Sequence, residues 1–245
     1  MADKLRRRSE DQEYFQRLSR TEVWQHNIVW IAFVTLVATG FMSKVPEGWV
    51  VGFFGKYAGS VYAWRRFLHI LFAVILIIGS IWHVGYILLT KRGRQVLFDI
   101  IIMPKDLKQL VQNVAYMWSK SFGGEEKEKP RFDRFDYREK LEYLFGLIGT
   151  TVIILTGTVM TFSSLFPKIA VEISATFHIC EATLATLAIA VWHFYAIHWK
   201  PGRFPQDTAW IDGLMSMEHL KHEHPLQWER VMQEKEGQKK GDIEI

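Results

Sequence analysis

Cysteine is almost absent from this chain of 245 residues, since Cys180 is the only one. One thiol rules out an intrachain disulfide and a CxxC metal site, because each of these needs two cysteines. The lack of a CxxCH motif also excludes a covalently attached haem. Without such a role, Cys180 is expected to be a small buried side chain.

Charged residues are missing from three long apolar runs and nearly missing from a fourth. Residues 23–42, 67–90 and 144–167 contain no Asp, Glu, Lys or Arg, and residues 173–199 contain only Glu181. A helix needs about 20 such residues to cross about 30 Å of hydrocarbon. The sequence therefore predicts an all-α integral membrane protein, a four-helix bundle. The helices are expected over residues 23–42, 64–90, 141–166 and 173–199.

A cleavable signal peptide is also lacking, because the first 20 residues have no apolar core. All but five of the 30 Lys and Arg residues lie in residues 1–22, 91–140 and 200–245. This bias predicts a multi-pass membrane protein with both termini in the cytoplasm. The net charge of +4 then reflects topology and contact with anionic lipid headgroups, and no nucleic acid partner is expected.

These expectations divide the chain into three parts. Residues 1–22 form a cytoplasmic N-terminus, residues 23–199 the transmembrane domain, and residues 200–245 a cytoplasmic tail. Within the domain, the cytoplasmic connector 91–140 mixes apolar and charged residues at helical spacing, which predicts one or two helices lying at the membrane interface. The tail histidines are expected to be solvated: His219, His222 and His224.

Two of the apolar runs carry histidines at matched depths, although polar groups are costly there. His69 and His83 are fourteen residues apart, and His178 and His193 are fifteen apart. Fourteen residues of α-helix rise about 21 Å and bring both side chains to nearly the same face. In helices that run parallel across the bilayer, His69 then faces His178 near the external side, and His83 faces His193 nearer the cytoplasm.

Two neutral imidazoles on facing helices are the axial ligands that a six-coordinate haem b iron needs. Zinc fits less well, because it takes three or four convergent ligands. The sequence therefore predicts a bundle that holds two haems b between its helices. His26 lies at a depth similar to His193 and competes with His83 as its partner, whereas pairing His26 with His198 would raise the count to three haems.

Two further features lie within the apolar runs. The first run ends VATGFM and the third ends ILTGTVM, so that Gly40 and Gly157 hold like positions. Glycines in the third run, Gly146 and Gly149 among them, are expected to permit close helix packing. Glu181, one turn after His178, is an intramembrane acid and a candidate for relaying protons.

In these features the chain resembles the four-helix cytochrome b subunits (gamma subunits) of formate dehydrogenases. It is also similar to the cytochromes b of nickel–iron hydrogenases and to relatives that serve thiosulfate reductases or multihaem c cytochromes. The resemblance covers residues 20–230. It is carried by VWQHNIVWIAFVTLVATGF, RRFLHILFA, FDYREKLEYL, ILTGTVM, HICEATLATLAIAVWHFYAIHWKPG and KHEHPLQWER.

The resemblance implies that His69 and His178 bind the external haem and that His26 and His193 bind the cytoplasmic one. The separation of His178 and His193 is one residue longer than in the formate dehydrogenase pattern, which a local bulge would absorb. His83 is not part of that pattern, but it fits the paired-histidine helices of quinol–cytochrome c reductases. The partner of His193 stays open, since resemblance favours His26 and regular helix geometry favours His83.

Basic residues near these histidines are candidate partners of the haem propionates. Arg65 and Arg66 are expected at the external haem, and Arg20, Lys200 and Arg203 at the cytoplasmic one.

The expected function is that of a diheme membrane-anchor subunit, an electron-transfer part of a quinone oxidoreductase rather than a self-sufficient enzyme. Its partners would be an external dehydrogenase, reductase or multihaem cytochrome c subunit and a quinone or menaquinone beside the cytoplasmic haem. Whichever of His26 and His83 is not a ligand would hydrogen-bond the quinone. The external loop 43–66 is rich in aromatics, and either docks that partner or dips into the headgroups.

Two alternatives belong to other functional classes. One is a haem-free membrane protein that uses its histidines for proton or metal transport. The other is a transmembrane electron shuttle that works without a catalytic partner.

Overall fold

The computed structural model describes residues 13–123, 125, 127–200 and 207–241. The chain forms two compact units. Unit 1 comprises residues 1–17, 91–145 and 213–245, and unit 2 comprises residues 18–90 and 146–212.

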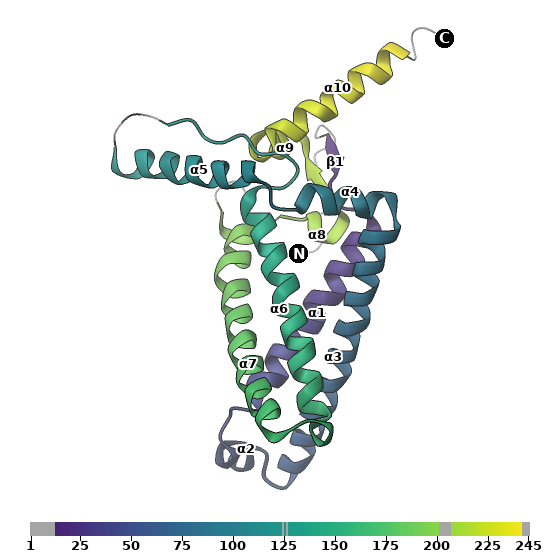
Figure 1. Cartoon of the computed structure of the whole chain (residues 1–245), viewed down its shortest axis with the longest axis vertical. Coiled ribbons are helices and arrows are strands. Elements are labelled where there is room, and N and C mark those ends of the chain that lie inside the picture. The colour runs from purple at the N-terminus through teal and green to yellow at the C-terminus, as the bar shows by residue number, and fades with distance from the viewer. Residues whose placement is uncertain (1–12, 124, 126, 201–206, 242–245) are drawn as a thin grey trace. The chain divides into compact units, whose positions relative to one another are not determined.

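Unit 2 contains the long apolar helices (Figure 1). They are α1 (Arg20–Met42), α3 (Ala58–Leu89), α6 (Tyr137–Thr161), which enters the unit at Gly146, and α7 (Lys168–Leu187). Two π-helical segments, η3 (Ala188–His193) and η4 (Tyr195–Trp199), continue α7. The shorter elements are α2 (Glu47–Phe54), η1 (Gly55–Tyr57), η2 (Ser163–Leu165) and α8 (Ala209–Asp212).

Four helical segments of the described chain are long and apolar enough to cross a membrane, as predicted. They cover Arg20–Met42, Glu47–Leu89, Tyr137–Thr161 and Lys168–Trp199. The second begins before the expected residue 64 because α2 and η1 precede α3, and the fourth begins before residue 173 because α7 itself starts at Lys168. The predicted all-α membrane fold is therefore confirmed.

The first membrane helix begins at a capping box. The Ser19 hydroxyl accepts from the backbone N–H of Glu22, and the Glu22 carboxylate accepts from the N–H of Ser19 at 2.6 Å. Such a box satisfies two N–H groups that the first helical turn leaves unpaired. The other oxygen of Glu22 accepts from the Tyr86 hydroxyl at 2.9 Å, which links the start of α1 to the end of α3.

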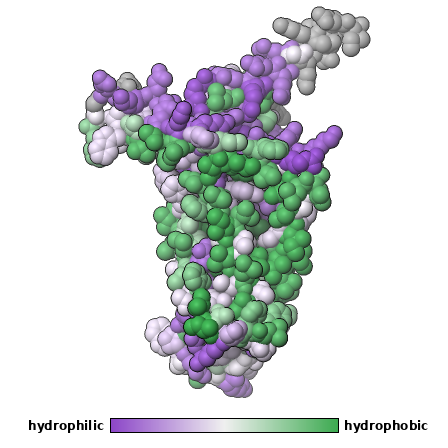
Figure 2. All heavy atoms as spheres, viewed as in Figure 1, coloured by the Kyte–Doolittle hydropathy of each residue, from purple (hydrophilic) through white to green (hydrophobic). Residues whose placement is uncertain are grey.

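Most side chains on the outer faces of these helices are apolar and exposed (Figure 2). Ile78 and Ile81 on α3 and Val191 on η3 are each more than 60% exposed. Lipid is the partner for such a surface, because the hydrocarbon of the bilayer is as apolar as the side chains. Threonine hydroxyls on these helices bond the carbonyl one turn back, as Thr151 does to Leu147, so that they carry no unsatisfied polar group.

Unit 1 joins both ends of the chain to the connector. Strand β1 (Tyr14–Gln16) pairs antiparallel with β2 (Leu214–Ser216), with Tyr14 opposite Ser216. Helices α9 (Met217–Glu223) and α10 (Pro225–Gly241) follow. A small core gathers Met215, Met217 and Leu220 with Phe15, Trp228, Val231 and Met232. Sequence patterning does not reveal this pairing, because three-residue strands are too short for a period of two to stand out.

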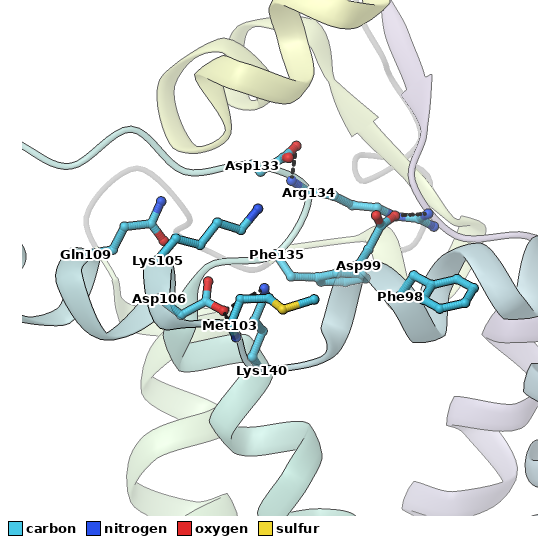
Figure 3. A pocket seen from close by; sticks show the side chains of 10 residues that line it. All are labelled: Phe98, Asp99, Met103, Lys105, Asp106, Gln109, Asp133, Arg134, Phe135 and Lys140. Atoms are coloured by element: carbon cyan, nitrogen blue, oxygen red, sulfur yellow. Dashed lines mark hydrogen bonds and ion pairs between the residues drawn. The ribbon is translucent and has the colours of Figure 1, made fainter.

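The connector forms α4 (Lys91–Ile100) and α5 (Pro104–Phe122), in agreement with the predicted one or two helices. The start of α5 is tied to the start of α6 by a buried ion pair between Lys140 Nζ and Asp106 Oδ2 at 2.9 Å (Figure 3). Asp106 also caps α5 by accepting from the N–H of Met103 at 2.6 Å, and Lys140 donates to the carbonyl of Ile101. A buried pair is tolerated when further hydrogen bonds satisfy it in this way.

The tail corrects one expectation from the sequence. His224 was predicted to be solvated, but it is only 2% exposed and its Nδ1 donates to the carbonyl of Asp133 at 2.6 Å. Burial, followed by the nearby positive charge of Arg17, lowers the pKa of His224 from 6.5 to about 4. The tail therefore packs a neutral imidazole into unit 1.

Candidate functional site

Four of the predicted histidines meet in two pairs inside unit 2. The rings of His69 on α3 and His178 on α7 have centres 6.4 Å apart, with an angle of 62° between their planes. The rings of His26 on α1 and His193 at the end of η3 have centres 6.3 Å apart, with an angle of 35°. Each pair thus joins residues from two helices that are distant in the sequence.

These separations are those of two imidazoles that share one metal ion. A metal-bound imidazole nitrogen lies about 2.0 Å from the metal, and the ring centre lies about 1.1 Å behind that nitrogen. Two imidazoles on opposite sides of one iron therefore have ring centres about 6.2 Å apart. Direct hydrogen bonding or stacking between two rings does not explain why both pairs have this same separation of ring centres.

A threonine on the neighbouring helix fixes the ring of His69. Thr39 Oγ1 on α1 lies 2.8 Å from His69 Nδ1 and 2.7 Å from the carbonyl oxygen of Thr35. A carbonyl only accepts, so the single hydroxyl proton is donated there and the hydroxyl accepts from Nδ1–H. The neutral His69 then carries its lone pair on Nε2, the nitrogen available to a metal.

The same arrangement recurs on the other side of the pair. Thr156 Oγ1 on α6 lies 3.0 Å from His178 Nδ1 and donates to the carbonyl of Val152 at 2.6 Å. By the same reasoning His178 donates through Nδ1 and keeps its Nε2 lone pair for a metal. Sequence reasoning missed both threonines, although a shared signal was present: each directly precedes a glycine, in VATGFM and in ILTGTVM.

Those two glycines lie beside the histidine rings. A Cβ added to Gly40 would lie 3.5 Å from Cε1 of His69, and one added to Gly157 would lie 3.2 Å from Cε1 of His178. Gly146, expected to permit close packing, has nothing within 4 Å of such a Cβ among the described residues. In both Thr–Gly dipeptides the threonine bonds the ring, but only at Gly157 would a side chain crowd the ring, since 3.5 Å at Gly40 is an ordinary contact.

His83 occupies a different position from the one that regular helix geometry predicts. Its Nδ1 lies 2.9 Å from Oε1 of Gln25. An amide oxygen only accepts, so His83 donates through Nδ1 and is oriented by α1. The ring that faces His193 is that of His26, the residue next to Gln25.

The extra residue between His178 and His193 falls in the π-helical segment η3. A π-helix bonds each residue to the fifth one along, so each of its turns takes up more residues than an α-turn. Segment η3 is thus the local bulge expected from the longer spacing of His178 and His193. His198 lies in η4, where its ring contacts those of Phe194 and Trp199 at 5.6 and 6.4 Å.

The predicted propionate partners are placed unequally. Arg65 is partly buried, and its Nη1 donates to the carbonyl of Thr39 at 3.5 Å. Arg66 and Arg20 are exposed, and Lys200 is partly buried. Arg203 lies outside the described residues.

The polar residues near His178 differ in their surroundings. The Glu181 carboxylate lies against Gly149 on α6, where an added Cβ would collide with its Oε1. Cys180 is exposed on α7, which corrects the prediction of a buried side chain. On a membrane helix this exposure places the thiol toward lipid rather than in a protein core.

Other site types find little support in the described part of the chain. It brings together no three His, Cys, Asp or Glu side chains that would hold a metal ion. One of the pockets of unit 1, shown in Figure 3, is a cavity of about 80 Å³ whose lining includes Phe98, Asp99, Lys105 and Arg134. None of the residues predicted for the site lines it, and it is too small for a drug-sized ligand.

Comparison with known proteins points to one family. The model of the family described as prokaryotic cytochrome b561 matches residues 17–209, a range that contains both histidine pairs and both threonines. A comparison with curated proteins gives no match.

Proposed function

Because the chain belongs to the prokaryotic cytochrome b561 family and is thus a membrane haem b protein of electron transfer, we propose that it holds two haems. His69 and His178 would bind one iron, and His26 and His193 the other. The observation that carries this proposal is the separation of the ring centres, 6.4 and 6.3 Å, in two independent pairs. Both agree with the distance of about 6.2 Å expected for two imidazoles on one iron.

The chain's own residues prepare the site for this group. Thr39 and Thr156 hold two of the rings with Nε2 as the bare nitrogen, and Gly157 leaves space beside the ring of His178. The helices that carry these rings are apolar, as a haem site in a membrane requires. When bound, haem b supplies a one-electron couple at its iron, whose potential the protein tunes by ligation, hydrogen bonding and burial.

We further propose that the chain is the membrane anchor of a quinone-linked redox complex. Electrons would pass between a partner protein at the external side and a quinone or menaquinone near the His26–His193 pair. With His26 assigned to the iron, His83 is the residue left for the quinone side, and its bond to Gln25 sets its orientation. The partner would be a dehydrogenase, a reductase or a multihaem cytochrome c, docked near the exposed aromatic residues Trp49 and Phe53 of α2.

Absorption spectroscopy of the purified protein tests the proposal. The reduced protein should give an α band near about 560 nm, the region of bis-imidazole haem b, and pyridine haemochromogen assay should count two haems per chain. Single alanine replacements of His69, His178, His26 and His193 should each remove one haem. A double variant that lacks His69 and His178 should lose no more haem than either single variant.

His83→Ala is the matched control, because His83 is a membrane histidine that the proposal leaves off the iron. This variant should keep both haems. A colourless wild-type protein would overturn the proposal as a whole. Loss of one haem from His83→Ala, with both retained in His26→Ala, would instead transfer the second ligand role to His83.

Co-purification separates an anchor subunit from a free-standing electron shuttle. An anchor should bring a redox partner with it in mild detergent, and Trp49→Ser together with Phe53→Ser should weaken that association. A shuttle would purify alone with both haems intact.

A further inference from the structure

We propose that Thr39 and Thr156 are positioning residues that together lower the reduction potential of the haem between His69 and His178. The proposal rests on the proposed function, because it concerns the two rings assigned to that iron. It adds a role for two hydroxyls that are not themselves ligands.

Each hydroxyl comes from a helix other than the one that carries the histidine. Thr39 on α1 accepts from His69 on α3, and Thr156 on α6 accepts from His178 on α7. The four long helices α1, α3, α6 and α7 thus all contribute to this one pair of rings. An imidazole held at Nδ1 in this way cannot rotate about its Cβ–Cγ bond without breaking the hydrogen bond, so the direction of Nε2 is fixed before the haem arrives.

The hydroxyls are themselves held in an accepting state. Thr39 Oγ1 donates to the carbonyl of Thr35 at 2.7 Å, and Thr156 Oγ1 donates to that of Val152 at 2.6 Å. The chain from ring N–H to hydroxyl to carbonyl is directed one way, and each bond in it polarises the next. Because a hydroxyl has one proton, neither threonine can reverse its role without losing its bond to the helix.

The electronic consequence has a definite sign. A hydrogen bond donated by Nδ1–H leaves more electron density on the ring and makes Nε2 a more basic ligand. A more basic ligand stabilises ferric iron relative to ferrous iron, which lowers the potential of the couple. Both rings assigned to this iron donate a hydrogen bond from Nδ1 to a threonine hydroxyl, so both bonds lower the reduction potential.

Valine has the shape of threonine without the hydroxyl, which makes Thr39→Val and Thr156→Val the direct tests. Each should shift the ferrous-to-ferric ratio of one haem about tenfold toward ferrous at a fixed potential. For a one-electron couple that is a rise of about 59 mV in midpoint potential. The double variant should shift the same haem further, and the other haem should keep its wild-type potential. The measurement is a potentiometric titration of the purified protein followed at the α band.

Each helix supplies a matched control. Thr35 on α1 and Thr151 on α6 bond only a carbonyl one turn back, that of Ile31 and that of Leu147. Thr35→Val and Thr151→Val should leave both potentials unchanged. Thr39→Ser and Thr156→Ser keep the hydroxyl and should restore the wild-type potential.

The outcomes separate this proposal from the one on which it rests. Two haems per chain at wild-type potentials in both valine variants would overturn it and leave the haem assignment standing. A wild-type protein without haem would remove the haem assignment itself. The valine variants could instead lose a haem. In that case, serine variants that keep both haems at the wild-type potentials would support the proposed role of the hydrogen bond. Loss in the serine variants as well overturns it, because the hydroxyl alone would then not suffice.

Discussion

A single added methyl group at Gly157 would press on the ring of His178. The new Cβ would lie 3.2 Å from Cε1, closer than side chains normally approach, whereas at Gly40 the corresponding distance is an ordinary 3.5 Å. Gly157→Ala should therefore displace the ring and weaken haem binding at this pair by about 1 kcal/mol or more, the lower end of overpacking costs. Haem content after mild denaturant treatment, measured by pyridine haemochromogen, reports the loss.

Gly40→Ala and Gly146→Ala are the controls for that substitution. The first should be nearly neutral and the second fully so, since nothing described lies within 4 Å of a Cβ at Gly146. Equal haem loss in all three variants would mean that helix packing, and not the ring, is the sensitive element.

The buried imidazole of His224 makes unit 1 sensitive to acid. Its pKa is about 4 in the folded protein and 6.5 in an exposed chain, so between these values the unfolded chain binds a proton that the folded unit does not. The stabilisation is complete above about pH 6.5 and is lost progressively as the pH falls to 4. The total change is roughly 3 kcal/mol at most, from the conversion of a pKa difference into free energy.

Hydrogen exchange of α9 and α10, followed by mass spectrometry and corrected for the intrinsic effect of pH, measures this loss of protection. The charged groups that act on His224 are Arg17, Glu139 and Asp136, so a variant at His224 itself is needed to assign the effect. His224→Gln should flatten the pH profile between 6.5 and 4. An unchanged slope in that variant would assign the acid sensitivity to the carboxylates instead.

At the level of elements, the histidine positions and the facing of His69 and His178 could be predicted from the sequence, but helix geometry alone gave the wrong partner for His193. Matched spacing in two apolar runs identified His69, His83, His178 and His193, since that spacing survives in any pair of long helices. The argument that His83 faces His193 assumed a regular α-helix. The π-helical segment η3 breaks that regularity, and its only signal in the sequence is the spacing of His178 and His193, one residue longer than in the formate dehydrogenase pattern. The ring that lies opposite His193 is that of His26.

Helix α5 has an apolar stripe that no described residue covers. Leu107, Val111, Val114, Trp118 and Phe122 recur at helical spacing, and each is more than half exposed. Asn113, which lies outside this stripe, is buried and donates to the hydroxyl of Tyr137 at 2.9 Å. A helix with one apolar and one polar face, in a chain that also spans the membrane, is expected to lie in the interface with its stripe in the lipid.

Spin labels on cysteines placed in α5 test that expectation, in a background where Cys180 is replaced by alanine. A label at Val114 should be relaxed mainly by oxygen, which concentrates in lipid. A label at the exposed Gln112 should be relaxed mainly by a water-soluble nickel complex. Equal exposure of both labels to the nickel complex would show that the stripe meets water or a protein partner.

For the whole molecule, the sequence was sufficient to predict the membrane class and the four spans, because hydrophobic length and charge are properties of composition along the chain. It did not reveal unit 1. Its strands are three residues long, and they join segments about 200 positions apart, Tyr14–Gln16 and Leu214–Ser216. A register between such distant short segments depends on packing of Leu220 and its neighbours, which no local pattern encodes.

The distribution of Lys and Arg predicts the orientation of the whole chain, and with it the direction of the electron path. Residues 43–66 should be external and residues 91–140 cytoplasmic. In the Cys180→Ala background, a cysteine at the exposed Lys56 should react with an impermeant maleimide in intact cells. A cysteine at the exposed Lys127 should react only after lysis. This result would place the His69–His178 pair at the external side, where the redox partner docks, and the His26–His193 pair at the quinone side. The reverse labelling pattern would exchange the two sides and require the partner to bind from the cytoplasm.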